Sequence, residues 1–140
     1  LNVQPKTVED WVSRALAKLA DSPEAAIEDL QAAATIDPFH PLVLQNQAHV
    51  FAEYMEDDQQ AIEALNKLVL LQPSNDKARS GRAVTLARLE RFTAALDDLQ
   101  YLEASTRPLS PASMYQMGCA YALLHHSIED ASESLVQWLE

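Results

Sequence analysis

The stretch that decides the fold is AIEDLQAAATIDP, Ala26–Pro38, because the chain contains it three times in related forms. A close copy, AIEALNKLVLLQP, spans Ala61–Pro73, and a looser one, ALDDLQYLEASTRP, spans Ala95–Pro108. The prolines that close the copies follow one another at intervals of 35 residues. Self-similarity at a fixed period of about 20 to 50 residues indicates a chain assembled from stacked supersecondary units.

Each unit contains two amphipathic helices joined by a short polar turn. Asp21-Ser22-Pro23 provides a helix N-cap followed by proline at the first helical position. We expect each closing proline to stop the second helix, since proline cannot continue the hydrogen-bond ladder. With two glycines and abundant Ala, Leu, Glu and Gln, the composition also favours helix. The predicted helices are Thr7–Ala20, Pro23–Ile36, Pro41–Met55, Asp58–Leu71, Asp76–Leu89, Phe92–Ala104, Pro111–Leu124 and Ile128–Leu139.

Small and large residues recur at set places on these helices, which lets neighbouring helices approach closely while a bulky side chain fills the next gap. In the second helices the recurring sets are Ala26, Leu30, Ala33; Ala61, Leu65, Leu68; and Ala95, Leu99, Leu102. In the first helices they are Leu44, Gln47, Ala48, Phe51; Arg79, Arg82, Ala83, Leu86; and Met114, Met117, Gly118, Tyr121.

These patterns resemble the tetratricopeptide repeat, whose period is about 34 residues. The resemblance implies an all-α fold, a right-handed α-solenoid of stacked antiparallel helix pairs with about 3.5 to 4 units. It covers the chain as a single domain over residues 1–140, with repeats at about 7–40, 41–75, 76–110 and 111–140, the last truncated. The aromatic residue that the family carries at the start of each first helix is replaced here by Leu44, Arg79 and Met114.

A narrower resemblance lies in MYQMGCAYALLHHSIEDASESL, Met114–Leu135. This stretch is similar to the last repeat of long bacterial repeat arrays, including those that follow Ser/Thr kinase domains. It implies that the chain is a fragment of a larger signalling protein and contributes an adaptor segment to it.

Composition excludes several classes of partner. The net charge of −11 argues against nucleic acid, because phosphate binding needs a basic surface. No apolar run approaches the roughly 18 residues of a membrane span. A single cysteine, Cys119, excludes an internal disulfide and suits a reducing compartment, so we expect a cytoplasmic location.

Motifs that carry chemistry are also missing, so we expect no enzyme, no cofactor and no metal. The chain has no glycine-rich phosphate loop and no spaced set of cysteine and histidine ligands. We interpret His125-His126 as solvated histidines in a turn, and Asp97-Asp98 as solvation of a convex helix face.

The resemblance places the first helix of each pair on the concave side of the solenoid, where a peptide or partner domain would bind. The candidate groove residues are Gln45, Asn46, His49, Lys77, Ser80, Arg88, Tyr115 and Gln116. Half of all basic residues fall between Lys77 and Arg91, which would attract an acidic ligand. Two readings stay open: Arg79 and Arg82 pair with neighbouring carboxylates, or Lys77 and Arg88 contact the ligand.

We therefore predict a non-catalytic protein–protein interaction scaffold, with a structural spacer or oligomerisation segment as the alternative. The second helix of the fourth repeat should expose Leu135, Val136, Trp138 and Leu139, because no capping helix follows it. Such a face would make contacts that result from truncation, or else form a homodimer or a junction between domains.

Overall fold

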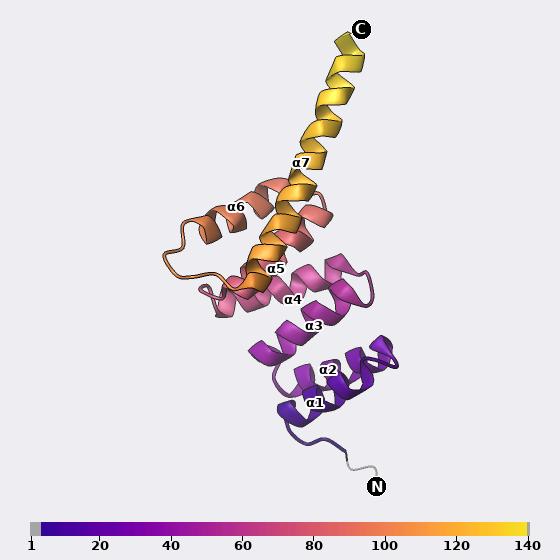
Figure 1. Ribbon diagram of the computed structural model, residues 1–140. Coiled ribbons are helices and arrows are strands. Elements are labelled where there is room, and N and C mark those ends of the chain that lie inside the picture. The colour runs from indigo at the N-terminus through magenta and orange to yellow at the C-terminus, as the bar shows by residue number, and fades with distance from the viewer. Residues whose placement is uncertain (1–3, 140) are drawn as a thin grey trace. The chain divides into compact units, whose positions relative to one another are not determined.

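The computed structural model describes residues 4–139, except for the side chain of Trp138, and within this range it contains seven helices and no strands. The predicted all-α class is confirmed (Figure 1). The chain divides into two compact units, Leu1–Asn75 and Asp76–Glu140. Their boundary coincides with the predicted boundary between the second and third repeats.

The first unit consists of two helix pairs. Helix α1 (Val8–Lys18) packs against α2 (Pro23–Ile36), and α3 (Pro41–Glu53) packs against α4 (Asp58–Leu71). The pairs are joined because α3 also contacts α2 and α1. Helices α1, α2 and α3 share a core, and Trp11 and Phe51 pack against it. Its buried members are aliphatic: Val8, Val12, Ala15, Ala26, Ile27, Leu30, Ala33, Val43 and Val50.

The second unit consists of one helix pair and a long third helix. Helix α5 (Asp76–Arg88) packs against α6 (Phe92–Glu103) and against α7 (Pro111–Leu139). The buried members of its core are Ala83, Val84, Leu99, Leu102, Met117, Ala120 and Leu124. All contributions from α7 come from its first half, so its second half takes no part in this core.

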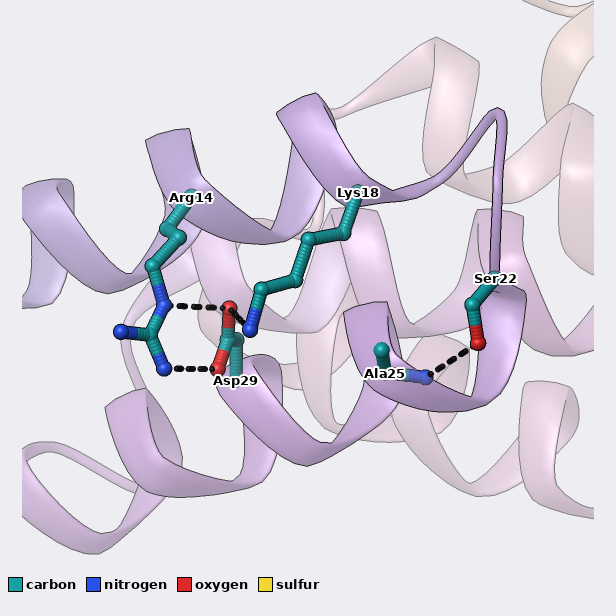
Figure 2. Close-up of polar contacts among 5 residues, drawn as sticks. All are labelled: Arg14, Lys18, Ser22, Ala25 and Asp29. Carbon is teal, nitrogen blue, oxygen red and sulfur yellow. Dashed lines mark hydrogen bonds and ion pairs between the residues drawn. The ribbon is translucent and has the colours of Figure 1, made fainter. Parts of the chain in front are cut away.

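Helix boundaries follow the turn chemistry of the sequence. Ser22 Oγ accepts a hydrogen bond from the backbone N–H of Ala25 (3.1 Å), which caps α2 (Figure 2). Asp57 Oδ1 does the same for the N–H of Gln60 at the start of α4 (3.1 Å). Both helices therefore begin and end at the residues that the sequence predicts.

Alanines let the two helices of a pair approach closely. Ala26, Ala61 and Ala95 each occupy the fourth position of a second helix and are 1%, 0% and 0% exposed. The leucines four residues later, Leu30, Leu65 and Leu99, are buried as well. A methyl group at the contact leaves no room for a longer side chain, so overpacking here would cost roughly 1 to 3 kcal/mol.

A buried aspartate fastens α2 to α1. Asp29 accepts two hydrogen bonds from Arg14, one from Nε and one from Nη2, both at 2.9 Å, and lies 3.1 Å from Lys18 Nζ (Figure 2). The hydrogen bonds from Arg14 have the largest effect on the pKa of Asp29 and lower it. Burial acts in the opposite direction, and Lys18 lowers the pKa further. The guanidinium of Arg14 also lies 5.0 Å from the ring centre of Trp11.

The third pair repeats this arrangement, and one sequence expectation is wrong here. Asp98, interpreted above as solvation of a convex face, is 1% exposed and accepts two hydrogen bonds from Arg82, both at 2.7 Å. Arg79 adds a third at 3.2 Å and stacks on Tyr101, with 3.8 Å to the ring centre. Its neighbour Asp97 is exposed, as expected.

The second pair lacks both halves of this aspartate–arginine contact. Ala64 occupies the seventh position of α4, where α2 has Asp29 and α6 has Asp98. Helix α3 contains no Lys or Arg to face a carboxylate. Loss of both partners together avoids leaving a buried charge uncompensated.

The fourth repeat differs most from expectation, because its two predicted helices form the single helix α7. Residues 125–127 contain no helix breaker, whereas the other turns contain Pro23 or a residue with positive φ, Glu56 (50°) and Glu90 (59°). His125 and His126 are helical instead, and pair with Glu129 (3.6 Å) and Asp130 (3.5 Å) one turn later. These pairs favour continuation of the helix.

The proline rule also fails in one place. Helices α2 and α4 end two residues before Pro38 and Pro73. Helix α6 ends at Glu103, and Pro108 follows only after four further residues. Pro108 therefore limits the connection to α7 and is not what stops α6.

Replacing Asp98 should destabilise the second unit. Asp98→Asn leaves Arg79 and Arg82 against an uncharged group at a site that excludes water, which should cost about 2 to 4 kcal/mol of unfolding free energy. Urea denaturation followed by circular dichroism measures it. Asp97→Asn, one residue away and exposed, is the matched control and should change the value by less than about 0.5 kcal/mol. Equal effects of both variants would contradict the assignment.

The lowered pKa of Asp29 predicts a specific pH dependence. Because the folded-state pKa lies below the unfolded value of about 3.9, the contribution is fully present above that value and is lost as pH falls through the folded pKa. The stability difference between wild type and Asp29→Asn should therefore be constant above about pH 5 and shrink below pH 4. Asp21→Asn, an exposed aspartate, controls for the removal of charge. A difference that grows on acidification would contradict the pKa direction.

Candidate binding surface

The predicted groove residues fall into two sets, one in each compact unit. Gln45, Asn46 and His49 lie on α3 of the first unit. The second set lies on two neighbouring helices of the second unit: Lys77, Ser80 and Arg88 on α5, and Tyr115 and Gln116 on α7. The structure thus places the residues of the second set on two helices that pack against each other, and each set is described within its own unit.

On α3, Gln45 and His49 are exposed on one face, four residues apart. The His49 ring meets the ring of Tyr54 edge-on, with 5.6 Å between centroids. Asn46 Nδ2 donates to the carbonyl oxygen of Leu42 (2.8 Å), which leaves its side-chain oxygen to face a ligand. This surface offers uncharged polar groups beside a tyrosine.

On α5, the predicted groove residue Ser80 is buried in the contact between α5 and α7. Ser80 is 0% exposed, and its hydroxyl donates to Gln116 Oε1 (2.8 Å) while lying 3.0 Å from the carbonyl oxygen of Lys77. The hydrogen bond fixes the contact between α5 and α7. Because Gln116 uses its oxygen internally, its amide N–H₂ is the group it can offer outward.

Exposed groups surround this buried hydrogen bond. Lys77 lies one helical turn before Ser80 and is exposed, and Tyr115 precedes Gln116 and is three-quarters exposed. Arg88 is exposed on the same face of α5, eleven residues after Lys77 and roughly 16 Å along the helix axis. Val84 lies between them and is buried against α7. The surface therefore consists of two cationic ends separated by a packed helix contact.

The sequence left open whether Arg79 and Arg82 pair with neighbouring carboxylates, and the structure confirms that they do. Both are bound to the buried Asp98, so their charge is compensated within the helix pair. Lys77 and Arg88 are exposed, and their contact with a ligand stays a prediction. The local positive charge available to a ligand is thus smaller than the sequence count indicates.

Sequence reasoning identified Tyr121 as a recurring first-helix residue but did not predict its partner on α6. The Tyr121 hydroxyl donates to Glu103 Oε1 (3.1 Å). Burial, followed by the hydrogen bond and charge of Glu103, raises the pKa of Tyr121, so the hydroxyl remains a donor at neutral pH. The pairing joins residues 18 positions apart in different helices, and no local pattern would have identified it.

Among residues 4–139, no group of three or more His, Cys, Asp or Glu side chains is placed to hold a metal ion. Within the same range no helix is long and apolar enough to cross a bilayer. Cys119 is a half-buried free thiol on α7.

No protein-family model matches this chain, and a search of curated proteins finds no significant match.

The hydrogen bond between Ser80 and Gln116 should stabilise the second unit. Ser80→Ala removes the donor, so the Gln116 oxygen loses this hydrogen bond, and the unfolding free energy should fall by about 1 kcal/mol. Ser13→Ala, at an exposed position of α1, controls for the loss of a hydroxyl. Urea denaturation of both variants is the measurement. A Ser80→Ala protein as stable as wild type would show that the hydrogen bond contributes nothing.

Proposed function

We propose that this chain is a non-catalytic interaction scaffold of tetratricopeptide-like helix pairs, which binds a peptide or partner domain through its first helices. The observation that carries the proposal is a set of polar side chains exposed on first helices beside the packed pairs: Gln45 and His49 on α3, Lys77 and Arg88 on α5, and Tyr115 on α7. A right-handed solenoid of the pairs is part of the proposal.

The ligand we propose is an acidic, extended peptide. Lys77 and Arg88 supply cations about three helical turns apart, which suits two carboxylates along one peptide. Tyr115 supplies an exposed aromatic surface, and Gln45 and Asn46 supply amides that can pair with peptide backbone in either sense. A single free cysteine suits a reducing compartment, and we propose the cytoplasm as the site of this interaction.

A second candidate is a spacer or oligomerisation segment of a larger signalling protein. The observation that favours it is the second half of α7, which projects apolar side chains outside the core of its unit. In that case the polar faces of α3 and α5 would have no ligand, and association would be the function.

A peptide library displayed on phage tests the proposal. Selection against the wild-type chain should enrich peptides rich in Asp and Glu. Lys77→Glu/Arg88→Glu should weaken the best of them about tenfold or more by isothermal titration calorimetry, because each cation would become repulsive.

Lys6→Glu/Lys67→Glu is the matched control, since it makes the same charge change at exposed positions that are not among the candidate residues. Circular dichroism must show that both double variants keep their helices. Equal loss of affinity in the two variants would indicate general charge attraction and contradict a defined site. Failure to enrich any peptide would favour the spacer.

A further inference from the structure

An apolar stripe runs along α7 and is largely exposed, although Tyr121 within it donates a hydrogen bond to Glu103 of α6. Met114, Tyr121, Ile128 and Leu135 follow one another at intervals of seven residues, and are 54%, 40%, 65% and 65% exposed. Seven residues are almost two turns, so the four side chains lie on one side of the helix. Leu139, one turn beyond Leu135, extends the stripe. Figure 1 shows the second half of α7, in yellow, continuing beyond α5 and α6.

The second half of α7 is built like the second helix of a pair. Its sequence repeats the spacing of α2. Ser127 corresponds to the N-cap Ser22. Ala131 and Leu135 correspond to the contact residues Ala26 and Leu30. Ala26 and Leu30 are buried against α1, and their counterparts in α4 and α6 are buried too. Ala131 and Leu135 are exposed. The contact face is therefore present and has no first helix against it.

The first half of α7 is built like a first helix and is open as well. Met114 corresponds to Leu44 of α3, which is 1% exposed. Gly118 corresponds to Ala48 and Ala83, both buried against the second helices of their pairs. A Cβ atom added at Gly118 would meet nothing within 4 Å. The position where a second helix should pack is thus unoccupied.

We propose that a second copy of this chain covers α7, with the two α7 helices antiparallel. The second half of each then packs on the first half of the other and completes two helix pairs. A continuous helix cannot fold back on itself, so its two halves meet their matching faces only in another copy. The two protomers thus exchange the second half of α7. Because the dimer is twofold symmetric, the interface between a first half and a second half occurs twice.

The two halves of α7 distinguish the antiparallel arrangement from the parallel one. Parallel packing would set each half beside its own copy, so the face of Ala131 and Leu135 would not meet the face of Met114 and Gly118. Antiparallel packing sets these two faces against each other, as in the helix pairs of the repeats. The carboxylates of α7, Glu129, Asp130 and Glu133, lie on the side of the helix away from the stripe and stay outside the interface.

Sedimentation equilibrium between about 5 and 200 μM tests the association. We expect the wild-type chain to dimerise, and Leu135→Asp to raise the dimer Kd about tenfold or more, because it places a charge in each apolar interface. Gln137→Asp, which adds the same charge to the same helix away from the stripe, should dimerise like wild type. A monomeric wild type, or equal effects of the two variants, would overturn the proposal.

A second variant tests the exchange itself. Ile128→Pro after Ser127 recreates the Ser22-Pro23 start of α2, and proline is unfavourable inside a helix but favourable at its first turn. The variant should let α7 fold back as a hairpin, giving a monomer with nearly wild-type helix content by circular dichroism. A dimer that persists with Ile128→Pro would contradict the exchange.

Disulfide cross-linking determines the orientation. In a Cys119→Ser background, Met114→Cys and Leu135→Cys proteins mixed together should form a disulfide heterodimer, because these positions are opposite each other in the antiparallel pair. Leu135→Cys alone should cross-link slowly. Rapid cross-linking of Leu135→Cys alone would establish parallel packing and overturn the arrangement.

Discussion

Close approach of two helices at an alanine is the constraint on which the rest of this structure depends. Ala26, Ala61 and Ala95 are almost completely buried at the same position of three second helices, and each is followed one turn later by a buried leucine. Such a pair buries one apolar face and leaves others open, so a single pair is not a stable fold. Repetition supplies the missing contacts: in the first unit α3 packs on α2 and α1, and in the second α7 packs on α5.

The buried aspartates act on the same interface. Asp29 joins α2 to Arg14 and Lys18 of α1, and Asp98 joins α6 to Arg79 and Arg82 of α5. No buried side-chain nitrogen or oxygen in the described part of the chain is left without a partner. Removal of one partner from a buried ion pair is costly, whereas replacement of the whole set by apolar groups is often neutral. The second pair, with Ala64 and no cation on α3, illustrates the second case within the same chain.

Local signals predicted the helices well and failed where structure depends on distant contacts. Helices α2 and α4 match their predicted bounds because Ser22, Pro23 and Asp57 act within one turn. The turn at residues 125–127 was predicted by analogy with the other repeats, but no residue there interrupts a helix. Ser80 and Asp98 were assigned to surfaces because their partners lie 36 and 16 residues away, respectively. One sequence signal could have identified the Asp98 contact. The first and third repeats each have an arginine in the first helix and an aspartate at the seventh position of the second helix, and the second repeat has neither.

The most direct test transplants one pair into another. The triple variant Arg79→Leu/Arg82→Gln/Asp98→Ala gives the third pair the residues of the second, Leu44, Gln47 and Ala64. If the pairs are interchangeable modules, its unfolding free energy in urea should lie within about 1 kcal/mol of wild type, whereas Arg82→Gln alone should lose about 2 kcal/mol or more. A triple variant no more stable than that single variant would contradict the account, because the aspartate–arginine contact would then be irreplaceable in its pair.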